Sequence, residues 1–441
     1  MLGRNNDEAC LVLQPQTERL PDGQTQGVAI MMERVWCFNP KVKEFKQQIR
    51  ESFLEFIRTP EILHIIVIFL CWRVFLYLIA YLSGIVVEVN SDFGQQPNPL
   101  ASIGNLLFRS WIHWDSGWYL SIAENGYFFR GTEEQSSVAF FPLFPLAMRL
   151  FSRPLLLFMG ERDALVVAGI VVANTSFICY LVLLFKLTRQ VFYNRSDAIL
   201  IAKRAAIVAM LFPTAIFMIV PYSEALYLLM VIGAFYAARK GNWAVAGGFG
   251  ALAAIGRLNG VAIVLPLFWE FILQLRNRKV RWWKSLYLGC MPIGLLSFII
   301  YCAWKFNDPF AFLHAMQAPH WRRIPHLPWV SYFRECSFFI THLNNTWSML
   351  QLFYATIFIG LVILSLIYLP KTYAIYAIIN LLLPFSTNLV SIQRYVLVIF
   401  PGFMILGYLS RRELIWTILL ILLSLMQGVN VVLWVNGLWL G

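Results

Sequence analysis

Long apolar runs alternate with short polar or basic segments along most of this chain. An α-helix needs about 20 apolar residues to cross the hydrocarbon core of a bilayer. The runs approach that length and predict an all-α, polytopic membrane protein. The predicted spans are residues 62–86, 164–185, 202–220, 223–238, 285–304, 349–369, 373–391, 395–410 and 414–435.

The apolar segment 243–275 has basic residues on both flanks, so it has to cross the membrane twice. With about 33 residues it can do so only as two short or tilted helices. Its only break is the motif Gly256-Arg257-Leu258-Asn259-Gly260, where we expect the two passages to meet. The total becomes about eleven transmembrane helices, with a cytoplasmic N-terminus and an external C-terminus.

The segment before the first span divides into two parts. Residues 1–40 show no clear periodicity and predict a disordered cytoplasmic tail. In residues 41–60, apolar positions recur every three or four residues among basic ones. This pattern is typical of an amphipathic helix on the anionic inner surface of a membrane, with an ordinary solvated helix as the alternative. Residues 61–441 then form the transmembrane domain.

Composition and charge support this organisation. Hydrophobic residues make up 59% of the chain and charged residues 13%, whereas soluble domains carry about 25% charged residues. The net charge of +12 does not indicate a nucleic-acid-binding surface, because the basic residues fall in clusters between apolar runs. Such clusters stay on the cytoplasmic side. They lie at residues 41–46, 186–204, 239–240, 276–284, 371 and 411–412.

The remaining polar segments then fall together on the external side. They are the loop 88–163, the turn 221–224, the loop 306–348 and the segment 391–394. The orientation follows from charge alone, yet every unusual polar motif lies on one face. This agreement indicates a single external site. Within loop 88–163, the apolar run 146–159 is too short to span a bilayer and predicts a helix lying in the outer interface.

The most unusual motif of the first loop is His113-Trp114-Asp115. Aromatic residues surround the acid: Trp111, Trp114, Trp118, Tyr119 and Tyr127. Aromatic side chains often form a belt at the membrane interface, but such a belt does not explain a carboxylate among them. Asp115 is therefore a candidate general base, with the aromatic belt as the alternative.

Two motifs carry charge close to the membrane. In Pro221-Tyr222-Ser223-Glu224, Ser223 could cap the next helix and Glu224 could stabilise its first turn, which is the simpler interpretation. Arg257, with Asn259, is more informative, because arginine within an apolar hairpin is costly in lipid. We expect it either to bind phosphate or to pair with Asp115 or Glu224.

The later external segments add further polar candidates. Asp308, followed by Pro309, either starts a helix or belongs to the site. His320 and Trp321, which precede two arginines, indicate a polar or sugar-binding surface. Arg394 either extends to lipid headgroups or binds a phosphate, since a guanidinium can donate two parallel hydrogen bonds to it.

Taken in order, these motifs resemble the GPI mannosyltransferase 2 family and its bacterial relatives, which are polytopic glycosyltransferases of the GT-C superfamily. The motifs are HWD at 113–115, FFP at 140–142, PYSEAL at 221–226, GRLNG at 256–260, DPFAFLHA at 308–315 and SIQRY at 391–395. The resemblance implies a GT-C-like fold, with an external first loop that contains interfacial helices. Because the cytoplasmic loops are short, it favours a bacterial plasma membrane, with the endoplasmic reticulum membrane as the eukaryotic alternative.

The resemblance also implies a reaction. A hexose, usually mannose, would pass from a polyprenyl- or dolichyl-phosphate donor to a glycan or glycolipid acceptor. Asp115 matches the essential acid of the first external loop in GT-C enzymes, and Arg257 or Arg394 would stabilise the phosphate. Residues expected to bind the donor phosphate or the sugar are His113, Trp114, Tyr119, Tyr127, Tyr222, Glu224, Arg257, Asn259, Asp308, His320, Trp321 and Arg394.

No cofactor or metal is expected, because the chain carries no DxD, HExxH, Walker or dinucleotide-binding motif. Two other functional classes remain as alternatives. A flippase or transporter of lipid-linked sugars would need polar groups at the membrane midplane that are reachable from both faces. A non-catalytic scaffold of a glycan-assembly complex would leave the acid in the aromatic loop without a role.

Overall fold

The computed structural model describes residues 59–86, 100, 102–319 and 321–440. The chain forms two units, Met1–Ile62 and Leu63–Gly441, and the second contains the fold that positions the site. The predicted tail over residues 1–40 lies outside the described residues, as does the predicted amphipathic helix over 41–60 except for its last two residues.

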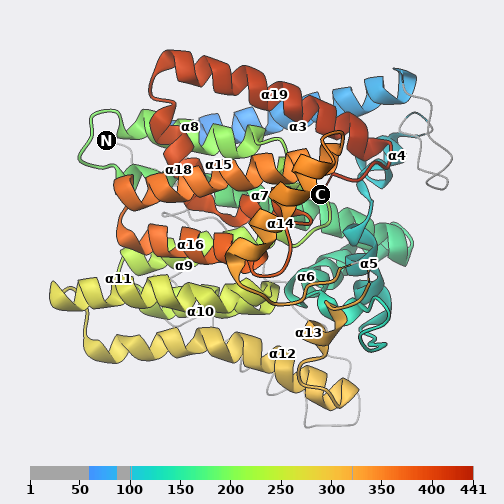
Figure 1. Cartoon of the computed structure of the whole chain (residues 1–441), viewed down its shortest axis with the longest axis horizontal. Coiled ribbons are helices and arrows are strands. Elements are labelled where there is room, and N and C mark those ends of the chain that lie inside the picture. Colours follow the sequence, from blue (N-terminus) through green and yellow to red (C-terminus); the bar gives the residue numbers. More distant parts are fainter. Residues whose placement is uncertain (1–58, 87–99, 101, 320, 441) are drawn as a thin grey trace, which may run out of the picture. The chain divides into compact units, whose positions relative to one another are not determined.

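Every regular element in the described residues is a helix (Figure 1). The longer helices are α3 (Pro60–Val86), α7 (Glu161–Val191), α8 (Ala198–Leu211), α9 (Glu224–Arg239), α10 (Trp243–Gly256), α11 (Val264–Arg276), α12 (Cys290–Phe306), α14 (Pro328–Thr341), α15 (Thr346–Tyr368), α16 (Lys371–Phe385), α18 (Phe400–Leu409) and α19 (Glu413–Val435). Shorter α-helices are α4 (Ile103–Leu107), α5 (Asp115–Asn125), α6 (Leu143–Ser152), α13 (Ala311–Ala315) and α17 (Ile392–Tyr395). The 3-10 helices are η2 (Arg109–Trp111), η3 (Ser137–Ala139), η4 (Arg153–Leu157), η5 (Ala215–Met218), η6 (Leu258–Ile263), η7 (Trp282–Gly289) and η8 (Val396–Val398).

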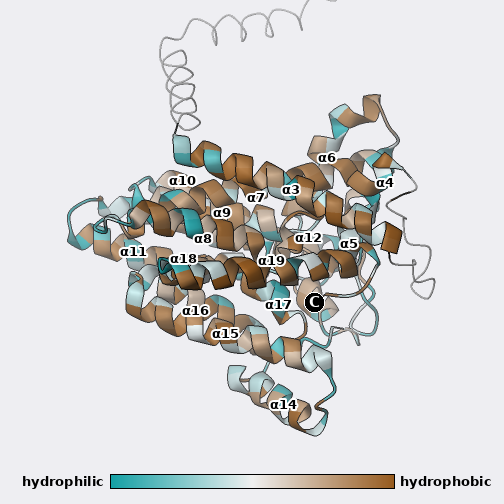
Figure 2. Cartoon of the chain, turned by 90° about the horizontal axis from the view of Figure 1, so that it is seen from above, coloured by the Kyte–Doolittle hydropathy of each residue, from teal (hydrophilic) through white to brown (hydrophobic). Residues whose placement is uncertain are grey.

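Six helical segments within the described residues are long and apolar enough to cross a membrane. They are Pro60–Val86, Glu161–Val191, Leu258–Arg276, Trp282–Phe306, Thr346–Tyr368 and Glu413–Val435. A bent pair, Ile392–Val398 with Phe400–Leu409, would make seven, and α10 and α16 are shorter apolar helices. Hydrophobic colours prevail along α3 and α19 (Figure 2). The chain is therefore an integral membrane protein, although the predicted count of eleven spans is not confirmed.

Proline lies at two places where the predicted spans and the helices differ. The span predicted over 202–220 ends early, at Leu211, because Phe212 precedes Pro213 and adopts extended backbone angles, φ −56° and ψ 135°. The span predicted over 395–410 is not one straight helix. It bends by 81° between η8 and α18, next to Pro401, which cannot donate a backbone hydrogen bond.

The predicted break at residues 256–260 is confirmed. Helix α10 ends at Gly256, and Arg257 follows with extended backbone angles, φ −159° and ψ 152°. The chain then turns through η6 into α11. A Cβ atom on Gly260 would lie 2.1 Å from the carbonyl oxygen of Ala253, so only glycine lets the chain return this closely to α10.

Basic connections predicted to be cytoplasmic gather at one end of the bundle. Arg239 pairs with Glu270 at 3.2 Å, and the hydroxyl of Thr372 donates to the same carboxylate at 2.9 Å. At this end too, Arg204 pairs with Glu413 at 2.5 Å. In Figure 1 the α11–α12 and α15–α16 connections lie on the left, whereas α5, α6 and α13 lie on the right. The predicted grouping of polar motifs away from the basic clusters is thus seen in the structure.

The described part of the first loop consists of short helices. The interfacial helix predicted over 146–159 corresponds to α6, which continues into η4. Met148 is fully buried against the bundle, whereas Leu150 and Leu157 are exposed. Apolar side chains that point outward at this position are consistent with contact to lipid, and the outer interface remains the predicted location.

Candidate active site

A cavity of about 1480 Å³ lies at the end of the bundle opposite the basic connections. Segments distant in sequence line it: the start of α5, the α10–η6 junction, α13, the C-terminal end of α16, and α17. All four external segments predicted from the sequence contribute residues to its wall. This shared cavity is what the single external site predicted from the sequence requires.

Asp115 is the first residue of α5 and lies on the cavity wall. The residue before it, Trp114, has positive φ, 53°, a strained conformation for a bulky side chain that costs about 1–3 kcal/mol. Tyr222 holds this turn in place. Its hydroxyl accepts a hydrogen bond from the Asp115 backbone N–H at 3.1 Å and donates to the His113 carbonyl oxygen at 3.4 Å. The tertiary structure therefore fixes the direction of the Asp115 carboxylate.

Four charged side chains form a continuous network beside the cavity. Arg394 pairs with both Asp115 and Glu224. Arg257 donates to the same Glu224 oxygen, Oε1, at 2.6 Å. Glu224 is fully buried, and the side chains of Arg394 and Asp115 are 6% and 18% exposed. Two carboxylates and two guanidiniums balance each other, which is how charges are tolerated away from water.

This network contains one of the pairings that the sequence left open. Arg257 pairs with Glu224, one of the two acids considered as its partner. Ser223 does occupy the N-cap position of α9, but its side chain makes no capping hydrogen bond. Instead it accepts a hydrogen bond from the Tyr119 hydroxyl at 2.8 Å. The motif 221–224 therefore ties α5 to α9 rather than only starting a helix.

Aromatic and apolar side chains form much of the remaining wall. The rings of Trp118 and Trp321 lie 5.9 Å apart, and each contacts Phe140. Trp114 contacts Trp439, near the C-terminus, with a centroid distance of 5.0 Å. Leucine, valine and alanine from η6 and α16 complete the apolar part: Leu258, Val261, Ala262 and Leu383. A cavity that is charged on one side and apolar on another suits an amphipathic ligand.

The predicted site residues fall into two groups. Asp115 and several predicted binding residues line the cavity: Trp114, Tyr119, Arg257, Asn259, Trp321 and Arg394. Others lie outside its wall: His113, Tyr127, Tyr222, Glu224 and Asp308. His320 lies outside the described residues. Tyr222 and Glu224 bond directly to residues of the first group. Tyr127 and Asp308 bond instead to other residues of the wall, Phe140 and His314.

His113 illustrates this supporting position. Its ring packs against Trp434 at 5.6 Å, and its Nε2 lies 3.2 Å from the carbonyl oxygen of Ser110. Burial lowers the pKa of His113 to about 4, so the ring is neutral near pH 7 and its Nε2–H donates to that carbonyl. Its contacts position the loop that ends at Asp115.

Asp308 forms a hydrogen-bonded pair with a histidine at the cavity. Its Oδ2 lies 2.6 Å from Nδ1 of His314, and His314 lines the wall. Asp308 also accepts a hydrogen bond from the Phe310 backbone N–H at 2.9 Å, as a helix-starting residue does. The two interpretations of Asp308 are thus compatible in one structure.

Sequence reasoning missed several residues of the wall. They include His314, Asn380, Thr387 and Trp439, and Arg323 was named only as one of two arginines after Trp321. Asn380 accepts a hydrogen bond from the Asn259 side chain at 2.7 Å. A polar residue within the apolar run of α16 was the available signal for Asn380, and the second arginine of 322–323 was the signal for Arg323. Among the described residues, no group of three or more His, Cys, Asp or Glu side chains could hold a metal ion.

The chain is similar in sequence to members of one protein family. A sequence model of the family described as Mannosyltransferase (PIG-V) matches residues 61–302, more than half of the chain. This match contains Asp115, Glu224 and Arg257. GPI mannosyltransferase 2 of Yarrowia lipolytica is 25% identical over 237 residues, which cover 54% of this chain and 61% of that protein.

GPI alpha-1,6-mannosyltransferase 2 of Rattus norvegicus is 30% identical over 202 residues, 44% of this chain and 39% of that protein. The chain therefore spans less than two thirds of either relative. Among solved structures, ArnT from Cupriavidus metallidurans bound to undecaprenyl phosphate aligns with a TM-score of 0.46 and 13% identity. The alignment covers 82% of this chain and 63% of that one.

Proposed function

The chain belongs to the mannosyltransferase (PIG-V) family, and from that membership we propose that it is a membrane-embedded mannosyltransferase. The donor would be mannose linked to a polyprenyl or dolichyl phosphate, and the acceptor a hydroxyl of a glycan or glycolipid. The observation that carries this proposal is the position of Asp115. It lies on the wall of a large cavity, in a strained turn, and belongs to a buried and balanced network of charges.

The proposed reaction is a single displacement. The acceptor oxygen attacks the anomeric carbon of the mannose, and the bond between that carbon and the phosphate oxygen breaks. The acceptor proton passes to the Asp115 carboxylate, and the lipid phosphate leaves with the bonding electrons. One displacement inverts the anomeric centre, so a β-linked donor would give an α-linked product. General-base assistance of this kind contributes a factor of about 100 to 10,000 in rate.

Arg394 has a specific part in this scheme. Because it pairs with Asp115 and Glu224 at once, it holds the Asp115 carboxylate in one position at the cavity wall. A carboxylate held in one orientation toward the cavity is placed to accept the acceptor proton. Arg394 is therefore a positioning residue for the proposed base.

The mixed character of the cavity supports a lipid-linked donor. The charged network adjoins apolar residues of η6 and α16, such as Val261 and Leu383. A polyprenyl phosphate carries a charged head on an apolar chain, and the cavity offers both kinds of surface at once. A nucleotide sugar would leave the apolar part of the wall without a partner.

The proposal also covers the side of the membrane on which the cavity lies and the acceptor of the mannose. The distribution of basic residues supports an extracytoplasmic cavity, in which residues 61–441 would be the catalytic domain and loops 88–163 and 306–348 would lie outside. The relatives' names mention GPI and an alpha-1,6 linkage. Since the chain spans only 61% and 39% of those proteins, the proposal stops at a glycan or glycolipid acceptor.

A transfer assay tests the proposed activity. The purified full chain in nanodiscs would be incubated with polyprenyl-phosphate [³H]mannose and a panel of glycan and glycolipid acceptors. We expect labelled product that depends on the acceptor, and none from UDP- or GDP-linked sugars. Movement of a fluorescent lipid-linked sugar between leaflets of proteoliposomes, without transfer, would instead show a flippase and overturn the proposal.

A further inference from the structure

Three arginines line the cavity, and they differ in how their charge is compensated. They are Arg257, Arg323 and Arg394. Arg257 pairs with Glu224, and Arg394 pairs with Glu224 and Asp115. No carboxylate pairs with Arg323 anywhere in the part of the chain that the structure describes. Arg323 therefore contributes an uncompensated positive charge to the wall.

The partners of Arg323 are neutral oxygens. Its Nη1 donates to the Thr387 hydroxyl at 3.3 Å, and its Nη2 donates to the Val390 carbonyl at 2.9 Å. The guanidinium also lies over the ring of Tyr395, 4.7 Å from its centroid. These contacts hold the side chain in a defined position without cancelling its charge, and the residue is only half-buried.

The backbone around Arg323 is held equally firmly. Its N–H donates to the Met316 carbonyl at 3.0 Å, and the Asn388 side chain donates to the carbonyls of Trp321 and Arg322 at 3.0 and 3.2 Å. Arg322 has positive φ, 41°. A strained and anchored backbone beside a cavity is typical of a preorganised ligand site, and less so of an arginine that only extends to lipid headgroups.

The carboxylates near each arginine determine which of the three arginines would bind a phosphate. A phosphate that approached Arg394 or Arg257 would also approach the carboxylates of Asp115 and Glu224, which repel it. Arg323 forms no ion pair with a carboxylate within the described residues, so a phosphate there would not have to displace one. Arg257 lies over the same Tyr395 ring at 5.5 Å, so the positive region extends from Arg323 toward the charged network.

We propose that Arg323 binds the phosphate of the lipid-linked donor, while Arg257 and Arg394 hold the carboxylates of the site. This assignment rests on the proposed mannosyltransferase function. It places the leaving group near Arg323 and the base at Asp115, on separate segments of one wall. A planar guanidinium suits phosphate because it can donate two parallel hydrogen bonds.

The test compares Arg323→Gln with Arg323→Lys and with a matched control, Arg322→Gln. Arg322 is the exposed neighbour and does not line the cavity. Two quantities would be measured in nanodiscs: KM for polyprenyl-phosphate mannose, and Kd for polyprenyl phosphate alongside uncharged polyprenol. Loss of one charge-assisted phosphate contact should raise KM and the phosphate Kd of Arg323→Gln about 10- to 100-fold. Polyprenol binding and the Arg322→Gln control should stay within about twofold.

The outcomes separate the two proposals. If the wild type transfers mannose and well-folded Arg323→Gln keeps a wild-type KM, the phosphate assignment is wrong and the proposed function stands. If Arg323→Gln does not fold, Arg323→Met decides, because it keeps an extended side chain but removes the charge. A raised donor KM in that variant supports the assignment, and an unchanged KM overturns it. A wild type that transfers nothing overturns the function and this assignment together.

Discussion

Two buried glutamates at opposite ends of the bundle use the same chemistry in different ways. At the basic end, Glu270 engages both carboxylate oxygens. Its Oε1 accepts from Arg239 at 3.2 Å and from Gln274 at 3.0 Å, and its Oε2 accepts from Thr372 at 2.9 Å. At the cavity end, Glu224 receives both of its arginines on Oε1. Its Oε2 is buried without a hydrogen-bond partner in the described residues.

This difference in hydrogen bonding distinguishes a glutamate that only connects helices from one that belongs to the candidate active site. A buried polar group whose oxygens are all bonded makes a rigid connection, and Glu270 joins α9, α11 and α16 in this way. Glu224 instead pairs with Arg394, and Arg394 also pairs with Asp115, which lies on the cavity wall. Residue type and burial are the same in the two cases, so only the completeness of the hydrogen bonding and the adjoining cavity distinguish them.

Backbone strain follows the same division. Five non-glycine residues in the described chain have positive φ: Trp114, Arg278, Asn307, Arg322 and Ser391. Four of them come one to three residues before Asp115, Asp308, Arg323 or Arg394, and only Arg278 lies at the basic end. Conformations of this kind persist where the surrounding structure imposes them. Most of the positive-φ residues therefore lie at the cavity end.

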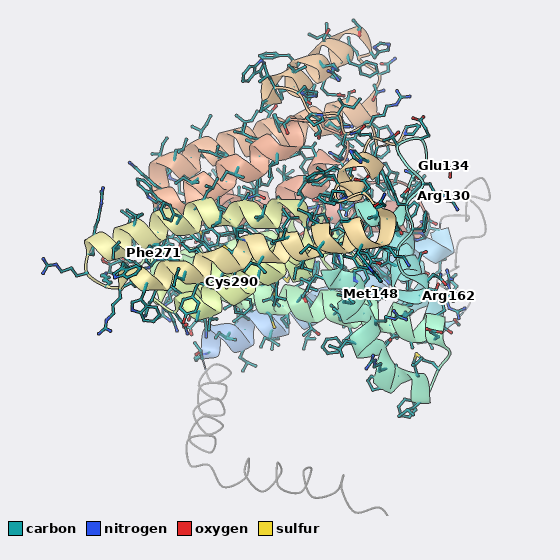
Figure 3. The ribbon with its side chains drawn as sticks, turned by 90° about the horizontal axis from the view of Figure 1, so that it is seen from below. Arg130, Glu134, Met148, Arg162, Phe271 and Cys290 are labelled. Atoms are coloured by element: carbon teal, nitrogen blue, oxygen red, sulfur yellow. The ribbon has the colours of Figure 1, made fainter. Side chains whose placement is uncertain are left out.

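The largest expected difference between the two ends is their accessibility across the membrane. Glu133 and Lys279 are both exposed, and Figure 3 shows neighbouring Glu134 far from Phe271 of α11, the helix that Lys279 follows. In a cysteine-free background, Glu133→Cys should react with a membrane-impermeant maleimide on intact cells or sealed right-side-out vesicles. Lys279→Cys should react only after permeabilisation. The reverse pattern would place the cavity on the cytoplasmic face and contradict the external site.

Asp115→Asn tests the proposed base directly. The amide keeps the size of the side chain but cannot accept the acceptor proton, so kcat should fall by a factor of about 100 to 10,000. Mannosyl transfer from the lipid-phosphate donor would be measured together with the thermal unfolding midpoint. Asp115→Glu serves as the control, because it keeps the carboxylate and should retain part of the activity. Full turnover by a folded Asp115→Asn protein would exclude the mechanism, and the Asp308–His314 pair would become the next candidate.

The same substitution in the two glutamates sharpens the comparison. Glu270→Gln should lower the free energy of unfolding by about 3 kcal/mol, the low end for breaking a buried ion pair, because Arg239 is 26% exposed. Its transfer rate per folded molecule should stay within about twofold of the wild type. Glu224→Gln should destabilise by about 3–5 kcal/mol, since two arginines lose their shared partner.

Glu224→Gln should also lower the transfer rate of the folded fraction, by about tenfold, because Arg394 would no longer hold Asp115 in one position. Guanidinium titration of both variants gives the stability, and transfer assays normalised to folded protein give the rate. Equal loss of activity in the two variants would show that the structure makes no functional distinction between them. Normal activity of Glu224→Gln would remove the charged network from the site.

Much of the fold was predictable from local pattern. The span over 62–86 corresponds to α3, and 414–435 to α19, because long uninterrupted apolar runs leave few other options in lipid. The break at 256–260 was also predictable, since glycine and arginine interrupt an apolar segment that is too long for one passage. Shorter runs were less informative, because Pro213 and Pro401 divide them and hydropathy alone does not register a backbone break.

By itself, the sequence determined the chemistry that is available, namely which residues are charged within apolar surroundings. It also predicted which polar segments lie together. Charge in lipid is costly wherever it lies, so it is visible without a fold. Only the tertiary structure decided the partners. Asp115 and Arg394 are 279 residues apart, and nothing in either motif specifies their ion pair or leaves Arg323 uncompensated. Which charged side chains form ion pairs depends on how distant helices pack. Only the folded structure therefore shows which arginine is left without a carboxylate partner and can bind an anionic ligand.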